Sequence, residues 1–399
     1  GYVCAIRLAQ LGLKTACIES RGTLGGTCLN VGCIPSKSLL NLSEEFHKVK
    51  GLAKKGIEIG NVKLNLDKMM KSKDKAVTVL TKGVEFLLKK NKVTYFKGKG
   101  SFKSKNEILI KDDQNKEILI KTEKTVIATG SKSVSLPGIE IDEKIIVSST
   151  GALKFDKVPK KMVVVGGGYI GLEMGSVWSR LGSEVHVIEY LDHITPGLDK
   201  EISQEFMKIL KKQKINFHLN TKVERISKTD KGVILETNNN QNKKQKFEGD
   251  VVLISVGRKP FTKSLNIEKI GIQCDSKGRV KVNEKFKTNI NNIYAVGDVK
   301  DGPMLAHKAE EEGIAGIHAL FRQMLQPTLP SWTTDHAKKT AFDSMDNAIG
   351  QALADWKKWE DDETQLARLM LIELLAWQFA SPVRWIETQQ NIFSPVEMG

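Results

Sequence analysis

Long apolar runs, arginine and cysteine are all scarce in this chain of 399 residues. No apolar stretch approaches the roughly 18–20 residues that span a bilayer, so we expect no membrane partner. Only nine of the 62 basic residues are Arg, the side chain favoured for forked contacts with phosphate and guanine. Five cysteines without a secretory leader favour a reducing, cytoplasmic compartment, where a disulfide is usually catalytic.

Lysine is abundant, and it gives the chain a formal net charge of +15. Residues 1–319 carry 55 Lys and Arg against 36 Asp and Glu, whereas residues 320–399 carry 7 against 11. The frequency of tryptophan also changes near this place, because Trp178 is the only one of the six tryptophans before residue 330. The lysines are spread among apolar residues and no nucleic-acid motif is present, so we expect a solvated surface and no nucleic-acid partner. The two parts read as unlike pieces joined together.

A complete strand–helix–strand unit with a glycine loop lies between residues 161 and 189. In such a loop Gly166 makes the tight turn, Gly168 lets the backbone approach a pyrophosphate, and Gly171 allows close packing of helix on strand. Glu189 ends the second strand, where a carboxylate binds the ribose 2′-hydroxyl of NAD and repels the phosphate of NADP. The unit predicts an NAD-binding domain, with a glycine-rich turn that binds nothing as the alternative.

Residues 2–19 read as the second half of a similar unit, with a helix followed by a strand that ends at Glu19. The first strand and its glycine loop would lie upstream of Gly1, and the sequence does not begin with Met. We therefore expect the beginning of this unit to be missing. An ordinary helix–strand pair remains the alternative for this segment alone.

Two cysteines five positions apart, Cys28 and Cys33, stand in a glycine-rich segment. A disulfide between them requires the backbone to bring them together, which Gly32 eases. Near a helix N-terminus their thiolates would be stabilised and reactive. A pair of metal ligands or two inert buried thiols are the other interpretations of the spacing. We expect no metal site, because the remaining cysteines do not stand at the ligand spacing of a zinc site.

The motifs together resemble those of the pyridine nucleotide–disulfide oxidoreductase family, from Gly1 to about Ile314. Within that family, the string Leu29–Lys37 and the NAD-type Glu189 are most similar to the dihydrolipoamide dehydrogenases, not to the NADPH-using glutathione reductases. The motifs occur in the order of the family: Glu19, Gly25–Lys37, Ala128–Gly130, Gly166–Glu173, Gly257–Pro260 and Gly297–Asp298.

The resemblance implies an α/β fold of two Rossmann-like dinucleotide-binding domains followed by an all-α C-terminal tail. The FAD-binding domain, incomplete at its N-terminus, would take residues 1–150 and 278–316 and carry the redox disulfide. The NAD-binding domain would take residues 151–277. The tail, residues 317–399, would be of separate origin, and the dimerisation domain of the family would be absent.

The resemblance also implies a reaction, the oxidation of dihydrolipoyl groups by NAD⁺ through a Cys28–Cys33 disulfide and FAD. A substrate thiol would attack Cys28, and the released Cys33 thiolate would pass electrons to a flavin beside Lys37. Glu173 would lie near the nicotinamide. The substrate would be carried by a dihydrolipoyl-bearing protein of a 2-oxo acid dehydrogenase complex.

Further residues would bind the two cofactors, FAD and NAD. Glu19 would bind the adenosine ribose of FAD, and Asp298 the ribityl chain, although Asp298 is also interpretable as a turn cap and Lys37 as a surface residue. The full implied set is Gly1, Glu19, Gly26, Thr27, Lys37, Ala128, Thr129, Gly130, Gly166, Gly168, Gly171, Glu189, Gly257, Arg258, Gly297, Asp298, Met304, Leu305, Ala306 and His307.

Two departures from the family pattern lower the expected activity. The first FAD-binding strand and loop, and the C-terminal domain that forms the homodimer and supplies a His–Glu acid/base pair, have no counterpart in the sequence. We therefore expect weak FAD retention, very low turnover and a doubtful homodimer. A non-catalytic NAD-binding fragment is the alternative function.

The tail has a resemblance of its own. Residues 371–388 look like part of the acyltransferase region of type I fatty acid synthases, and residues from about 317 onward could derive from such a protein. An acyltransferase remnant, without catalytic residues, is thus a third possibility. A helical extension with a Trp-rich apolar face is the plainer interpretation.

Overall fold

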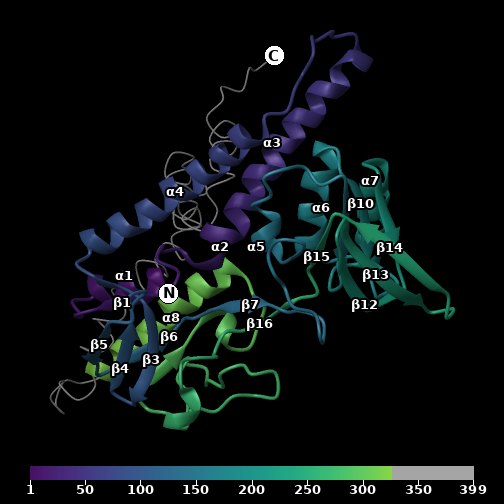
Figure 1. The fold of residues 1–399 in the computed structure, drawn as a ribbon. Helices are drawn as coiled ribbons and strands as arrows, with labels where there is room; N and C mark the ends of the chain where they lie inside the picture. The colour runs from purple at the N-terminus through teal and green to yellow at the C-terminus, as the bar shows by residue number, and fades with distance from the viewer. Residues whose placement is uncertain (326–399) are drawn as a thin grey trace, which may run out of the picture.

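The computed structural model describes residues 1–325, except for the side chains of residues 53–54 and 318–325. Helices and strands form two bodies in this part of the chain (Figure 1). Segments far apart in sequence meet in one of them, because β6 (Thr125–Ile127) pairs in parallel with β17 (Ile293–Ala295). The intervening residues supply most of the other body.

A five-stranded parallel sheet, ordered β11-β10-β9-β15-β8, is the centre of the body predicted to bind NAD. Alternate residues of β9 face opposite sides: Met162 and Val164 pack with the helix α6, whereas Val163 and Val165 face a three-stranded antiparallel sheet. The elements are β8 (Ile146–Val147), β9 (Lys161–Val165), α6 (Tyr169–Leu181), β10 (Glu184–Ile188), α7 (Lys200–Lys212), β11 (Ile215–His218), β15 (Val251–Ile254) and the antiparallel strands β12 (Thr221–Thr229), β13 (Gly232–Asn239) and β14 (Lys244–Gly249).

The two bodies are joined through helix packing and a short strand pair. α3 (Cys33–Gly51) packs along α6, and α5 (Ser149–Ala152) lies at the end of α6 where Trp178 is fully buried and donates to the carbonyl of Ala152. β7 (Ser131–Ser133) pairs antiparallel with β16 (Arg258–Pro260). These contacts place the start of α3 beside the start of α6.

The body predicted to bind FAD contains two separate parallel strand pairs and one antiparallel sheet. β1 (Ala16–Glu19) pairs with β2 (Thr94–Lys97), and β6 pairs with β17. α1 (Tyr2–Gln10) lies against α8 (Ala306–Leu325). The remaining elements are α2 (Gly26–Val31), α4 (Leu66–Lys90), β3 (Lys99–Ser104), β4 (Glu107–Lys111), β5 (Glu117–Lys121) and the 3₁₀ turns η1 (Leu52–Lys55), η2 (Ile267–Ile270) and η3 (Gly297–Val299).

The α/β fold class is confirmed, and so are the strand–helix–strand unit and the helix–strand pair at the start. β8 precedes residue 151, and the bounds predicted for the domains stay predictions. β3 and β14 were not predicted, because each is mostly polar and contains a single large apolar residue, Phe102 or Phe247. The predicted all-α tail and its fatty acid synthase resemblance lie almost wholly outside the described residues.

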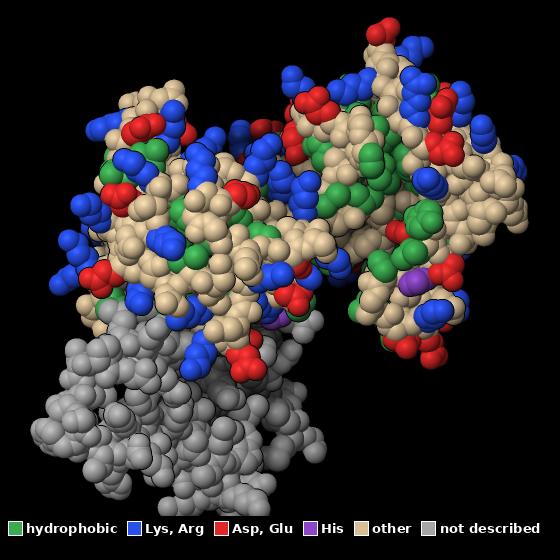
Figure 2. All heavy atoms as spheres, turned by 90° about the horizontal axis from the view of Figure 1, so that it is seen from below, with side chains coloured by type: hydrophobic (Ala, Val, Ile, Leu, Met, Phe, Trp, Pro, Cys, Tyr) green, Lys and Arg blue, Asp and Glu red, His purple; other side chains and the backbone are tan. Residues whose placement is uncertain are grey.

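Basic side chains on the face in Figure 2 are spread over both lobes and stand among acidic ones. Among the described residues, several lysines are paired with carboxylates, such as Lys228 with Asp142 and Lys246 with Glu236. Within residues 1–325, no helix combines the length and the apolar character needed to cross a membrane.

Candidate active site

A cavity of 2060 Å³ brings together most of the residues predicted to hold the flavin and the disulfide. It is lined by Gly1, Glu19, Gly26, Thr27, Cys28, Cys33, Lys37, Ala128, Thr129, Gly130, Glu173, Arg258, Gly297, Asp298, Met304 and Ala306. Leu305 and His307, which belong to the cofactor-binding set implied by the resemblance, are exposed and do not line the cavity. The cavity thus joins β1, α2, β6 and η3 to the starts of α3 and α6.

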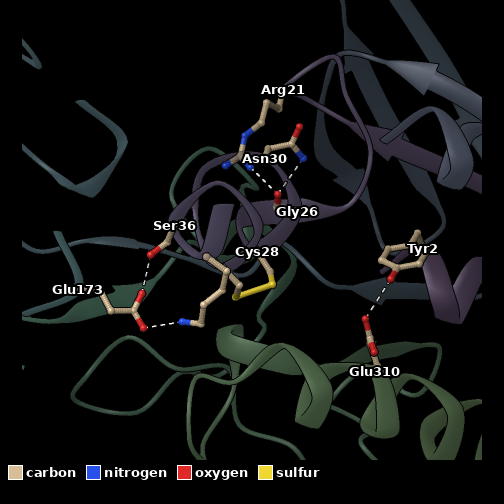
Figure 3. Close-up of a disulfide and its surroundings, with 10 residues drawn as sticks. Tyr2, Arg21, Gly26, Cys28, Asn30, Ser36, Glu173 and Glu310 are labelled. Atoms are coloured by element: carbon tan, nitrogen blue, oxygen red, sulfur yellow. Dashed lines mark hydrogen bonds and ion pairs between the residues drawn. A yellow bond between two sulfur atoms is a disulfide. The ribbon is translucent and has the colours of Figure 1, made fainter. Parts of the chain in front are cut away.

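The two cysteines of the glycine-rich segment form a disulfide (Figure 3), which confirms the predicted pairing. Cys28 lies in α2 and Cys33 begins α3, with their Cα atoms 4.7 Å apart, a normal disulfide separation. Gly32 makes the kink between the helices, and a Cβ there would lie 2.9 Å from the Thr27 carbonyl oxygen. Only glycine allows this close approach, so the backbone itself holds the cysteines together.

The turn before Cys28 is braced by two side chains that the sequence analysis gave no role (Figure 3). Asn30 donates to the carbonyls of Leu24 and Gly26, each at 2.9 Å. Arg21 donates to the same Gly26 carbonyl at 2.8 Å. Gly26 is thereby fixed at the wall of the cavity, one turn from the disulfide.

Lys37 of α3 and Glu173 of α6 meet at the cavity wall. Figure 3 labels Glu173 and its contact with Ser36. The Lys37 Nζ lies 2.5 Å from Glu173 Oε1, and the Ser36 hydroxyl donates to Oε2, also at 2.5 Å. Both carboxylate oxygens are therefore held. Ser36 is 5% exposed and was missed, although it lies three residues after Cys33 on the same helix face.

Asp298 is held by Ser131, which is itself held by Arg258. Ser131 donates to Asp298 Oδ2 at 2.5 Å, and the Arg258 Nε donates to the Ser131 hydroxyl at 2.8 Å. Burial lowers the pKa of Arg258, whereas the charge of Asp298 raises it. Asp298 thus ends a hydrogen-bonded chain that begins at Arg258, the first residue of β16, and its contact with the ribityl chain of FAD stays a prediction.

The glycine loop lies between β9 and α6, where the sequence analysis placed it. Gly166 has φ 103°, and a Cβ on Gly171 would lie 2.4 Å from the Gly166 carbonyl oxygen. Glu189 is only 7% exposed and accepts the Gly167 amide at 2.6 Å. The first amides of α6 have no partners within the helix, which suits this loop to an anionic phosphate, as predicted. Gly257, with φ 122°, lies directly before β16.

Comparison with known proteins identifies the family. The family model of pyridine nucleotide-disulphide oxidoreductases matches residues 1–313. The chain belongs to this family. It is 54% identical over 322 residues to a mitochondrial dihydrolipoyl dehydrogenase of Pisum sativum, covering 80% of this chain and 64% of that protein.

Other relatives of this oxidoreductase support the same family. A mitochondrial dihydrolipoyl dehydrogenase of Homo sapiens is 51% identical, covering 80% of this chain and 64% of that protein. A leghemoglobin reductase of Glycine max is 53% identical, covering 80% and 62%. The solved structure of the HOCl-induced flavoprotein disulfide reductase RclA from Escherichia coli is similar with a TM-score of 0.67 at 27% identity, covering 78% of this chain and 67% of that one. The chain thus spans a little under two thirds of the length of these curated relatives.

None of these matches supports the fatty acid synthase resemblance of the tail.

The cofactors of the oxidoreductase family are FAD and NAD(H), and the described residues fit both. The cavity reaches from Glu19 and Gly26 to the disulfide and the Lys37–Glu173 pair, which suits a long dinucleotide that must end beside sulfur. The loop of Gly166 and Gly168 at the start of a 13-residue helix suits a second dinucleotide. The individual roles of these residues stay predictions.

Proposed function

We propose that this chain carries out the dithiol–disulfide chemistry of a dihydrolipoyl dehydrogenase, oxidising dihydrolipoyl groups with NAD⁺ as the final acceptor. The observation that supports it most is the position of the Cys28–Cys33 disulfide and the Lys37–Glu173 pair on the wall of one cavity. Names of the pea and human relatives point to the same reaction.

The residues of the chain perform the sulfur half of this reaction. A dihydrolipoyl thiolate attacks Cys28, the S–S bond breaks, and Cys33 leaves as a thiolate. The second substrate thiol then displaces Cys28, so that the substrate becomes a disulfide and the protein a dithiol. Two electrons and two protons pass to the protein in all. Flavin, when bound, supplies the means to pass these electrons on to NAD⁺ as a hydride.

The two carboxylate contacts suggest how the charge of the site is controlled. Lys37 supplies a positive charge within reach of the cavity, which favours a thiolate over a thiol. Ser36 and Lys37 together hold both oxygens of Glu173, and so fix its orientation at the start of the NAD-binding body.

A direct assay tests the proposal. Chain supplied with FAD is mixed with dihydrolipoamide and NAD⁺, and NADH formation is followed by absorbance, with Cys28→Ser as the matched inactive control. NADH formation that depends on both FAD and Cys28 supports the proposal. Flavin-loaded chain that reduces no NAD⁺ overturns it.

A non-catalytic NAD-binding module is the second candidate. It is favoured by the separation of the glycine loop from the cavity, because Gly166, Gly168 and Glu189 do not line it. Its Lys-rich surface would then dock on an acidic lipoyl-bearing partner. Binding of NADH without FAD, and no NADH oxidation with FAD present, would favour this module.

The partner and the compartment are proposals of the same kind. We propose a dihydrolipoyl-bearing protein of a 2-oxo acid dehydrogenase complex as the partner. A cytoplasmic location stays a prediction, since the names of the pea and human relatives place those proteins in mitochondria. Cell fractionation followed by immunoblotting of this chain distinguishes the two compartments.

A further inference from the structure

The loop between β10 and α7 contains a strained threonine. Thr195 has φ 50°, and it is the only β-branched residue at positive φ among the described residues. Such a conformation is unfavourable for a β-branched residue and persists only where the surroundings impose it. Thr195 is 6% exposed and opens a tight turn in which the Leu198 amide donates to its carbonyl. Pro196 and Gly197, with φ 99°, are the residues that a type II turn requires next.

The backbone of Thr195 contacts the glycine loop directly. Its amide donates to the Gly167 carbonyl at 2.8 Å, while the Gly167 amide donates to Glu189 Oε2 at 2.6 Å. Glu189 Oε1 in turn accepts the Leu191 amide at 2.8 Å. Both polar groups of the Gly167 backbone are therefore held by the segment 189–195. Neither peptide unit beside Gly167 can rotate without breaking one of these bonds.

The side chain of Thr195 is fixed by the helix that follows. Its hydroxyl donates to the Ile194 carbonyl at 2.8 Å and lies 2.8 Å from the Ser203 hydroxyl. Because the Thr195 proton is used on Ile194, Ser203 is the donor of this pair. Ser203 is 1% exposed and sits in the first turn of α7, whose N-cap Asp199 accepts the amides of Glu201 and Ile202. The hydroxyl pair thus connects α7 to the glycine loop.

We propose that Thr195 is a positioning residue for the dinucleotide, which acts through Gly167 and Glu189 and is itself held by Ser203. The inference rests on NAD binding at this loop, as in the proposed function. Thr195 holds the loop in the conformation that presents the first amides of α6 to a pyrophosphate. It also limits the movement of Glu189, the carboxylate that favours NADH over NADPH.

Binding of NADH and NADPH, followed by the fluorescence of the reduced nicotinamide, tests the inference without any need for flavin or turnover. Thr195→Val keeps the branched shape but removes the hydroxyl. We expect it to raise the Kd for NADH about tenfold, the effect of losing one buried hydrogen bond, and to lower the preference for NADH over NADPH. Ser203→Ala should do the same, and Thr195→Ser should bind like the unsubstituted chain. The double variant should be no weaker than either single one.

The matched control is Thr237→Val on β13, because Thr237 is also buried and its hydroxyl likewise donates to a carbonyl, that of Gln245. It should leave both affinities unchanged. If Thr195→Val does not fold, Ser203→Ala gives the decision. Wild-type affinities and an unchanged NADH preference in the Thr195 and Ser203 variants overturn the inference alone. Absence of NADH binding to the unsubstituted chain overturns the proposed function together with the inference.

Discussion

Ser131 donates a 2.5 Å hydrogen bond to Asp298, although 167 positions separate the two residues in sequence. Arg258 donates to the same hydroxyl and to the Ser131 carbonyl, each at 2.8 Å. The Asp298 carboxylate on the wall of the cavity is thus held by Ser131, which Arg258 of β16 holds in turn. This contact joins β7 and β16 to η3.

Loss of this link should weaken flavin binding. Ser131→Ala leaves Asp298 without the Ser131 donor, so we expect the Kd for FAD to rise at least about tenfold, the effect of one hydrogen bond to a charged group. Quenching of flavin fluorescence measures it. Ser133→Ala on the same strand is the control, because the Ser133 side chain makes no hydrogen bond to any described residue. Equal FAD affinities in the two variants contradict the prediction.

The Lys37–Glu173 pair should matter more for electron transfer than for stability. Both side chains are partly exposed, at 42% and 27%, so Glu173→Gln should lower the free energy of unfolding by less than about 1 kcal/mol in urea. The amide can still accept from Ser36 but does not offset the charge of Lys37. We expect NADH oxidation by the FAD-loaded chain to slow about tenfold. A loss of stability well above this limit, with unchanged oxidation, would show a purely structural pair.

Gly171 lies so close to the Gly166 carbonyl that a single added methyl group should strongly weaken NADH binding. Gly171→Ala places a Cβ 2.4 Å from the Gly166 carbonyl oxygen and 2.6 Å from the Ser255 hydroxyl. The loop must move, so NADH binding should fall at least about tenfold, and the variant should lose about 1–3 kcal/mol of stability. Gly175→Ala, in the same helix and at 3.4 Å from Val185, is the control and should change neither. Titration calorimetry and thermal unfolding measure both effects.

A histidine pair at the edge of the parallel sheet predicts acid sensitivity. Burial, and then the nearby His186, lower the pKa of His218 below its ordinary value of 6.5. The rings also contact Phe247, and His186 is hydrogen-bonded to Glu184, which Lys161 approaches. Below about pH 6.5 the His218 side chain binds a proton more readily in the unfolded chain than in the folded one. The contribution of His218 to the free energy of unfolding is therefore fully present above this pH, and it decreases as the pH falls.

Thermal unfolding at about pH 7.5 and about pH 5.5 measures this effect. His218→Gln removes the group that titrates, so its Tm should fall about 2–4 °C less than that of the unsubstituted chain. Identical falls in both proteins would exclude His218 as the source.

Local patterns allowed the sequence to predict the parts of the site that depend on neighbouring residues. Gly166, Gly171 and Glu189 stand in one strand–helix–strand unit, and Gly32 stands between the two cysteines it brings together. In both places the residues that determine the conformation lie within about 25 positions of one another in the sequence.

The contacts that hold the site could not be predicted in the same way. Ser36–Glu173 and Ser131–Asp298 join residues 137 and 167 positions apart, and no periodicity reports such a pair. A turn after Thr195 could have been predicted, because Pro196-Gly197 is typical of a turn. The positive φ of Thr195 could not, because it depends on contacts with Gly167 and Ser203. β14 was not predicted, because Phe247 is its only large apolar residue and its other side chains are mostly charged.

Counting thiols under anaerobic conditions tests the central claim most directly. The chain holds five cysteines, of which Cys4, Cys17 and Cys274 are free, so the denatured, oxidised protein should react with three equivalents of a thiol reagent. After incubation with FAD and NADH it should react with five, whereas Cys33→Ser should give the same number before and after. A flavin-loaded chain that still shows three would contradict the account, because its disulfide would then receive no electrons from the nicotinamide.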